Sequence, residues 1–329
     1  MKKIKLLLVI LFSMYISGLA QQNSVPAYPV DTSYTLYGQF KKYKKSFPYL
    51  IPATENTPKG VIEDRDVIYE TLEKTKYGKR DLHLDVFRPG KEGKYPVLVL
   101  IHGGGWRAGN KSLQIPMAQK IASKGFVTVT VEYQLLLEEP YPAAVYNIKA
   151  AIRWIRANAE KYNIDPDKIA ISGCSAGGQL ASLVAMTNGL EYFEGTMGNL
   201  SFSSEVQAFI DIDGVINFLA PTSLNLNRTE NSPDVQWIGG FFNEVPEKWK
   251  EVSPIYWANE KTVPALFINS GFPKYHAGQD ELIGMLNEWG VYNEVHKFNV
   301  KMHAFWLFHP YFDGTTEYMI GFLEKTLKK

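Results

Sequence analysis

Hydrophobic and polar residues follow two different periods along this chain. Segments 67–69 and 82–87 alternate apolar and polar side chains, which is typical of half-buried strands. Later apolar runs are continuous, as in strands covered on both faces of a parallel sheet. These runs occupy residues 96–101, 126–131, 168–172, 206–212 and 263–268.

Helical patterns separate the apolar runs, at residues 113–124, 143–161 and 179–186. This alternation predicts a doubly wound, mostly parallel α/β sheet. Two stretches, 187–204 and 221–261, are longer than a connection between a strand and a helix of such a sheet needs to be. Since ligands bind beyond the carboxyl ends of such strands, both insertions are expected to wall that rim. The second contains Trp237, Trp249 and Trp257, at least two of which we expect to pack in its own core.

Composition excludes several classes of protein. The chain has 329 residues, 45% of them hydrophobic, which suits one large globular domain with insertions. Its formal charge of +1 lacks the basic excess of a nucleic-acid binder. The single cysteine rules out an intramolecular disulfide.

The first twenty residues have the layout of a secretory signal peptide. Three lysines precede an apolar run over 6–16, and small residues lead to a predicted cleavage site after Ala20. An uncleaved anchor is the alternative, but the run is shorter than the roughly 20 residues that a spanning helix needs. We therefore predict a secreted or periplasmic protein without stable membrane insertion.

Residues 21–64 are expected to form an N-terminal arm before a catalytic domain over 65–329. The arm is rich in Pro, Tyr and Lys, with a cluster at Lys41, Lys42, Lys44 and Lys45. Such a cluster can attract an acidic polymer, although a solvated arm is the favoured interpretation.

The sharpest motif is Gly173-Cys174-Ser175-Ala176-Gly177-Gly178, between a predicted strand and a predicted helix. A serine on such a turn is held in a strained conformation with its hydroxyl exposed, which predicts Ser175 as a nucleophile. Glycines permit the tight turn. Cys174 should face the interior as a small apolar filler.

A second motif, His102-Gly103-Gly104-Gly105-Trp106, also follows a predicted buried strand. Glycines let backbone N–H groups approach an oxyanion closely. We choose the N–H groups of Gly104, Gly105 and Ala176 as the predicted oxyanion hole.

A serine nucleophile needs a base, which follows the acid in the chain order of this motif. His296 lies within a predicted strand, whereas His303 follows that strand in a short loop before the C-terminal helix. His303 is therefore the predicted base, and His309 a pocket or packing residue.

These motifs, with Ser253-Pro254 and His303-Ala304-Phe305, resemble the esterase/lipase branch of the α/β-hydrolase fold. The resemblance runs from about residue 65 to the C-terminus. Three further short sequence segments resemble those of a narrower group, bacterial carbohydrate esterases that include α/β-hydrolase pectin methylesterases. They are residues 267–270, 275–280 and 303–310.

The acid departs from the general pattern of that branch. Most relatives place an Asp after the penultimate strand, where this chain has Gly271-Phe272-Pro273-Lys274. Asp213, at the end of the 206–212 run, is the preferred substitute, and its neighbour Asp211 could equally be the buried carboxylate. Asp280 is the rival, although a helix-start Asp is common without catalytic duty.

The resemblance implies a serine carboxylic-ester hydrolase acting on plant polysaccharide. Pectin methyl esters are the first candidate, and acetyl or feruloyl esters of pectin or xylan the second. Trp106, Arg107, Lys274 and His276 are predicted to contact this acidic or acetylated substrate, with Lys111 a further cation near the rim. A non-catalytic carbohydrate-binding protein on the same scaffold is the alternative. Neither metal nor cofactor is expected, since ligand spacing is absent from the sequence.

Overall fold

An eight-stranded sheet organises the chain, and the computed structural model describes it over residues 28–328. The predicted signal peptide lies outside these residues. The strands run in the order β2-β3-β5-β4-β6-β7-β8-β9, and pairing is parallel from β5 to β9. Their bounds are β2 Val61–Thr75, β3 Gly78–Pro89, β4 Tyr95–Ile101, β5 Val127–Val131, β6 Ile164–Cys174, β7 Ala208–Ile212, β8 Ala265–Asn269 and β9 Asn293–Lys297. The mostly parallel α/β sheet is thereby confirmed.

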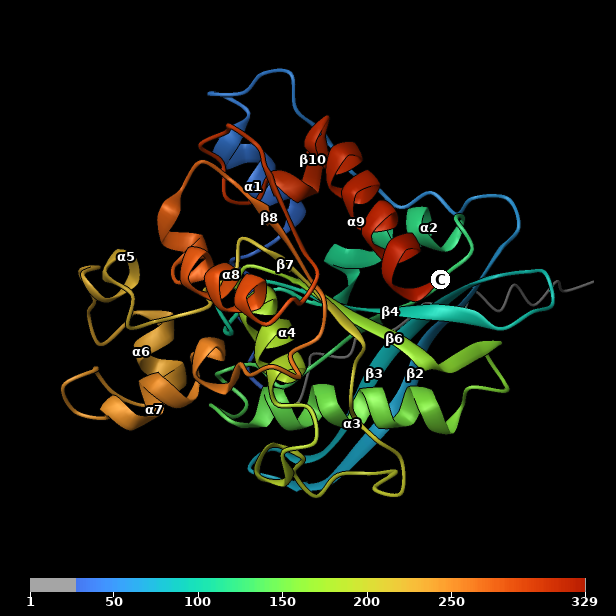
Figure 1. Cartoon of the computed structure of the whole chain (residues 1–329), viewed down its shortest axis with the longest axis horizontal. Helices are drawn as coiled ribbons and strands as arrows, with labels where there is room; N and C mark the ends of the chain where they lie inside the picture. Colours follow the sequence, from blue (N-terminus) through green and yellow to red (C-terminus); the bar gives the residue numbers. More distant parts are fainter. Residues whose placement is uncertain (1–27, 329) are drawn as a thin grey trace, which may run out of the picture.

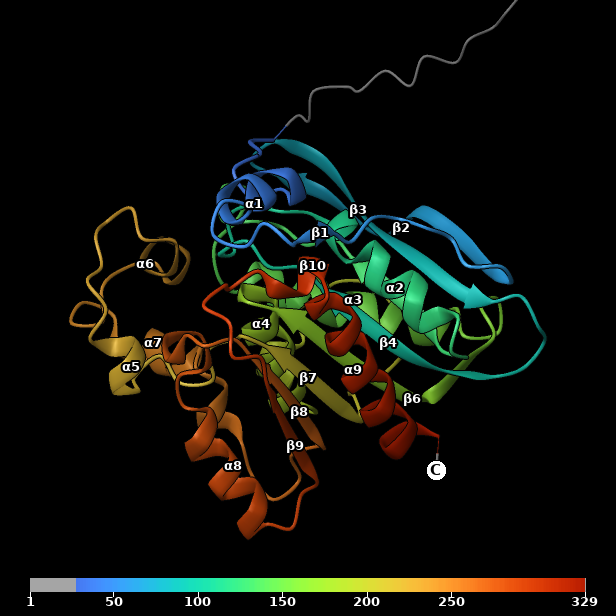
Figure 2. The same cartoon turned by 90° about the horizontal axis from the view of Figure 1, so that it is seen from above.

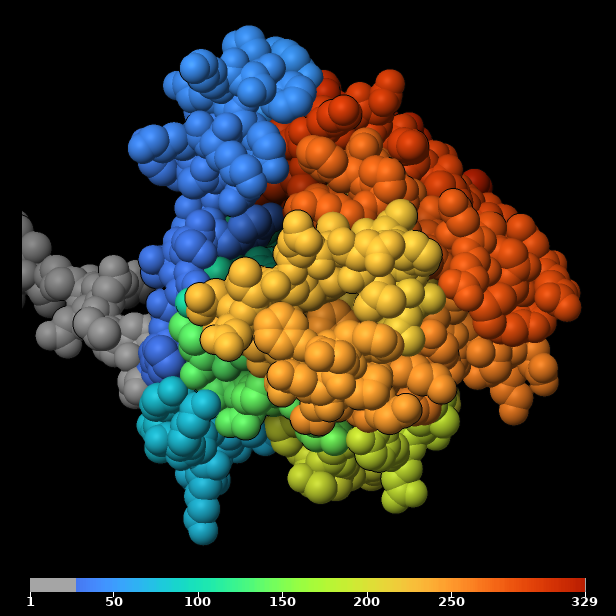
Figure 3. Space-filling view, turned by 90° about the vertical axis from the view of Figure 1, so that its left-hand side faces the viewer, coloured from blue at the N-terminus to red at the C-terminus, as the bar shows by residue number. Residues whose placement is uncertain are grey.

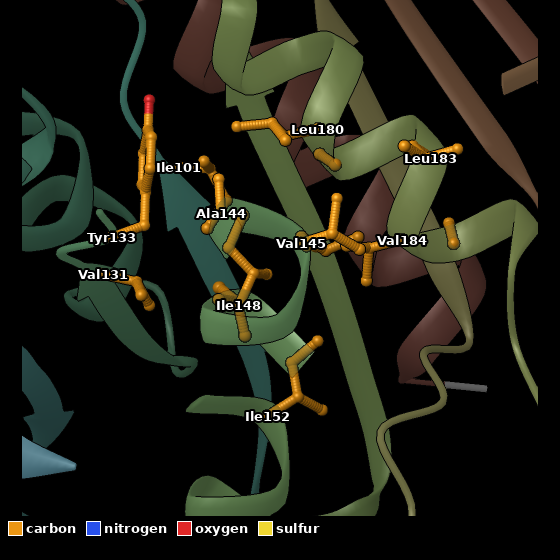
Figure 4. Close-up of a cluster of buried hydrophobic side chains, with 14 of the residues drawn as sticks. Ile101, Val131, Tyr133, Ala144, Val145, Ile148, Ile152, Leu180, Leu183 and Val184 are labelled. Carbon is orange, nitrogen blue, oxygen red and sulfur yellow. The ribbon is translucent and has the colours of Figure 1, made fainter. Parts of the chain in front are cut away.

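The continuous apolar runs become the central strands because helices cover both faces of the sheet (Figure 1). One face carries α2 (Ile115–Ala122) and α9 (Tyr311–Leu327). The other carries α3 (Ala143–Ala157), α4 (Ala176–Met186) and α8 (Gln279–Glu288). Figure 4 shows Val145 and Ile148 of α3 packed beside Leu180 and Val184 of α4.

Short helices build the second predicted insertion, which projects at one end of the molecule (Figure 2). They are α5 (Pro221–Leu224), α6 (Pro233–Ile238) and α7 (Pro246–Glu251). Trp237 and Trp249 are buried there, and the ring of Trp257 packs edge-on against Phe193. The aromatic ring neighbours lie outside the insertion: Trp237 stacks on Trp106, and Trp249 contacts Phe218 edge-on. The expectation that at least two tryptophans pack in the insertion's own core is therefore wrong, because these rings join the insertion to the main core.

The N-terminal arm differs from the solvated segment expected. Helix α1 (Leu36–Tyr43) packs Phe40 against Phe308, and β1 (Ile51–Pro52) pairs with β10 (Phe308–His309). The lysines of the cluster do face solvent, but apolar side chains between them bind the arm to the core. Strand β2 begins at Val61, so the sheet starts before the expected boundary at residue 65.

None of the helices in residues 28–328 combines the length and the hydrophobicity that crossing a bilayer requires.

Candidate active site

Ser175 occupies a sharp turn between the end of β6 and the start of α4. Its φ of 56° and ψ of −123° place it in a region that L-residues rarely adopt. A Cβ on Gly173 would lie 1.9 Å from the carbonyl oxygen of Gly177, and one on Gly177 would lie 2.3 Å from that of Ile101. Both positions therefore require glycine.

Ser175, His303 and Asp213 form one hydrogen-bonded chain. His303 Nε2 lies 2.7 Å from Ser175 Oγ, and His303 Nδ1 lies 2.9 Å from Asp213 Oδ2. The backbone N–H of Ser270 donates to the other Asp213 oxygen at 2.7 Å. An ionised Asp213 accepts at both oxygens, so Nδ1 of His303 carries the proton and Nε2 is free to accept one from Ser175.

Asp280 does not take part in this chain. It is exposed in the first turn of α8, and the carboxylate that contacts His303 is that of Asp213. Asp211 is also buried, but its Oδ1 accepts the N–H of Gly214 under the start of α4. Burial raises the pKa of Asp211 well above its ordinary value, and the neighbouring Asp213 charge adds to this.

Two aromatic side chains pack against the His303 ring. Tyr275 stacks on it with ring centroids 3.4 Å apart, and Trp306 contacts it edge-on at 5.2 Å. Burial is the largest cause of the lowered pKa of His303, and hydrogen bonding to Asp213 opposes that shift. A lowered pKa keeps the imidazole neutral near pH 7, which is the state a general base needs.

The second glycine motif lies against Ser175. A Cβ on Gly103 would lie 2.6 Å from the carbonyl oxygen of Cys174 and 3.0 Å from Cβ of Ser175. Gly104 and Gly105 have φ of 130° and 62°, and both line the same cavity as Ala176. Within residues 28–328, the N–H groups of these three residues donate to no protein acceptor. They are thus available to an oxyanion.

Cys174 points away from this cavity. Its buried Sγ lies 3.5 Å from Nε2 of Gln114, and burial raises the pKa of the thiol. A protonated thiol is a poor nucleophile.

Ser175 and His303 open onto a cavity of about 590 Å³. The arm lines one side through Asp31, Ser33, Tyr34 and Gln39, and the second insertion lines another through Ser223, Leu226, Asn227, Arg228, Ser232, Pro233 and Asp234. In Figure 3 the arm is blue, and the insertion is yellow to orange. The second insertion therefore walls the rim as expected, whereas residues 187–204 contribute nothing to the cavity lining, so that part of the expectation is wrong. The arm's share was not anticipated.

Three of the four predicted substrate contacts line the cavity: Trp106, Arg107 and Lys274. Trp106 stacks on Trp237 with centroids 4.8 Å apart, so it is mainly a packed wall. Arg107 Nε donates to Asp31 Oδ2 at 2.8 Å, which ties the arm to the glycine loop. Lys111 does not reach the cavity and instead pairs with Asp66 and Asp85.

His276 is a correction, because it is absent from the cavity lining. Its Nε2 is buried and has no hydrogen-bond partner in the part of the chain that the structure describes. Burial lowers the pKa of this histidine. Its neighbour Tyr275 stacks on His303 instead. The sequence segment that contains both residues does not indicate which of the two side chains faces the cavity.

No group of three His, Cys, Asp or Glu side chains suited to a metal ion occurs among residues 28–328.

Curated proteins similar to this chain include esterases. Esterase LipC of Mycobacterium tuberculosis is 28% identical over 226 residues, covering 66% of this chain and 55% of LipC. The chain thus spans about half the length of that relative, and the curated relatives matched next are covered to between 33% and 55%.

Two solved structures share the fold. One is a truncated carbohydrate esterase from gut microbiota, with a TM-score of 0.69, 24% identity, and coverage of 84% of this chain and all of that one. The other is a bifunctional GH43-CE protein of Bacteroides eggerthii, with a TM-score of 0.68 and 27% identity, covering 80% and 38%.

A family model also matches more than half of the chain. The match covers residues 84–278, from β3 through the elbow and the second insertion to the start of α8. This chain belongs to the BD-FAE family.

Proposed function

We propose that this chain is a serine carboxylic-ester hydrolase in which Ser175, His303 and Asp213 form the catalytic triad. The hydrogen-bonded chain from Ser175 Oγ through His303 to Asp213 carries the proposal. The N–H groups of Gly104, Gly105 and Ala176 beside it add support, since they donate to no acceptor in the described part of the chain, and so do the esterase relatives.

The reaction follows from the positions of these groups. His303 Nε2 accepts the Ser175 proton as Oγ attacks the ester carbonyl, and the three N–H groups stabilise the resulting oxyanion. His303 then protonates the leaving alcohol, and water activated by the same imidazole releases the acyl group. Asp213 holds the ring orientation and stabilises the imidazolium.

The proposed substrate is a plant polysaccharide ester met outside the cytoplasm, after removal of the signal peptide near Ala20. A methyl ester of galacturonate is the first candidate, with galacturonate as the acyl group and methanol released. Acetyl or feruloyl esters of pectin or xylan are the second. The cavity volume lies within the range of small-molecule sites, and carbohydrate esterases are among the structural relatives.

The test compares the wild-type protein with Ser175→Ala on methylated pectin, acetylated xylan and a short aryl ester. We expect methanol from pectin, and loss of about 10⁴-fold or more in kcat for every ester in the variant. Acetate without methanol would favour the second candidate. Equal rates above the protein-free background would eliminate Ser175 as the nucleophile. No hydrolysis by the wild-type protein would eliminate the esterase and favour the non-catalytic carbohydrate-binding alternative.

A further inference from the structure

Helix α1 ends in a cluster of lysines that the proposed reaction does not use. Lys41, Lys42, Lys44 and Lys45 are all exposed. Within residues 28–328 none of them pairs with a carboxylate, whereas other lysines, such as Lys120 and Lys149, do. The cluster is therefore a concentration of unneutralised positive charge.

The helix that carries this cluster borders the cavity that holds Ser175. Gln39 lines the cavity, and Lys42 follows three residues later on the same face of α1. Burial is the main cause of the lowered pKa of His303, and the charges of Lys274 and Lys42 lower it further. Gln39 of α1 and Lys274 line the same cavity as His303.

The other cations of the cavity are neutralised by neighbours. Arg107 pairs with Asp31 at 2.8 Å, and Arg228 pairs with Asp234 at 2.6 Å. Lys274 has no carboxylate partner among the described residues, and its Nζ lies 4.8 Å from the ring centroid of Tyr275. The excess positive charge is consequently concentrated between Lys274 and α1.

We propose that Lys274 and the α1 lysines form a docking surface for the free carboxylates of an acidic glycan. This inference rests on the proposed function: the ester-bearing unit lies at Ser175, and unesterified uronate units on its flank contact Lys42 and Lys274. A single exposed ion pair contributes only about 0–1 kcal/mol, so the surface acts through several weak contacts on one polymer. Salt screens such contacts, so binding through them should weaken as the ionic strength rises.

Binding of a fully de-esterified oligogalacturonate to the Ser175→Ala protein tests this surface. The comparison is with Lys42→Glu/Lys45→Glu in the same background. The control, Lys91→Glu/Lys94→Glu, changes charge equally on exposed lysines near the amino end of β4, at the opposite end of that strand from the glycine loop.

We expect the α1 variant to weaken binding by about tenfold or more and the control by less than about twofold. Raising salt from about 20 to 200 mM should weaken binding to the parent several-fold. The neutralising pair Lys42→Gln/Lys45→Gln should give an intermediate loss.

Binding that is indifferent to the α1 substitutions and to salt would overturn the docking surface. Equally tight, salt-independent binding of a neutral acetylated xylan oligosaccharide would also overturn it. These results are separable from the ester chemistry. If methylated pectin yields no methanol but oligogalacturonate binds as expected, the docking surface stands and the ester assignment fails.

Discussion

At the scale of single residues, three of the six non-glycine residues with positive φ among residues 28–328 lie at the site. Trp106, Ser175 and Asp213 are non-glycine residues with φ of 56°, 56° and 52°. Each such conformation costs on the order of 1 kcal/mol or more and persists only where the surroundings enforce it. For Asp213 the enforcing contacts include its N–H to the carbonyl of Ile268, and its carboxylate to Ser270 N–H and His303. The strain therefore directs this side chain at the imidazole.

Replacement of Asp213 by Asn separates the two candidate acids. Asn can still accept the Ser270 N–H, but its amide then presents N–H to His303 Nδ1 and favours the tautomer with the proton on Nε2. We expect kcat on an aryl ester to fall about 10⁴-fold, as loss of a triad acid does in serine proteases. Asp280→Asn is the matched control and should stay within about twofold, since Asp280 is exposed and remote from the ring contacts. Full activity in Asp213→Asn would refute the assignment.

At the scale of elements, the N-terminal arm completes the cavity. Leu36, Phe40, Tyr43 and Phe47 all pack against the α9-side core, and their spacing of four, three and four residues is that of one helix face. This pattern was available in the sequence, but the lysines interspersed with it suggested a solvated segment. The lysines in fact contact this aromatic face: Nζ of Lys42 lies 5.0 Å from the ring centroid of Tyr43, and Nζ of Lys44 lies 5.4 Å from that of Phe40.

Detaching α1 should open one wall without touching the catalytic groups. Phe40→Ala removes the contact with Phe308, whose ring centroid is 6.2 Å away. We expect a loss of about 1–3 kcal/mol in unfolding free energy, below that of a fully buried Phe, because Phe40 is only partly buried.

Faster amide exchange over residues 36–43 and a raised KM with little change in kcat should accompany that loss. Tyr37→Ala is the control, since Tyr37 is 75% exposed on the same helix. The arm is not a wall of the cavity if KM and exchange are the same in both variants.

At the scale of the whole molecule, local pattern predicted the sheet better than the cavity. Each apolar run overlaps an observed strand, and the elbow lies at the predicted strand–helix junction, because both depend on neighbouring residues. Contacts between residues that lie far apart in the sequence do not depend on neighbouring residues, so local pattern does not predict them. Arg107 and Asp31 are 76 residues apart, and Asp213 and His303 are 90 apart. Sequence reasoning could rank Asp213 above Asp280, but only the folded chain brings it to the imidazole.

Protonation of a carboxyl group at the end of β7 makes the stability of the whole molecule depend on pH. Asp211 and Asp213 are both buried at the end of β7, and the raised pKa of Asp211 means that the folded state keeps a proton there that the unfolded state releases above pH 4. Folded protein then binds more protons than unfolded protein, so this carboxyl's contribution to stability is full at low pH and decreases as pH rises towards its folded pKa.

Asp211→Asn isolates that contribution, because the amide cannot ionise and its oxygen can still accept the Gly214 N–H. Urea unfolding at pH 5, 6 and 7 should show the stability of the wild-type protein falling relative to the variant, by up to about 1.4 kcal/mol per pH unit. The slope should vanish once the pH exceeds the folded pKa of Asp211. A difference between the two proteins that is constant across this range would mean that Asp211 is already ionised in the fold, and Gly214 N–H would then be donating to a buried charge.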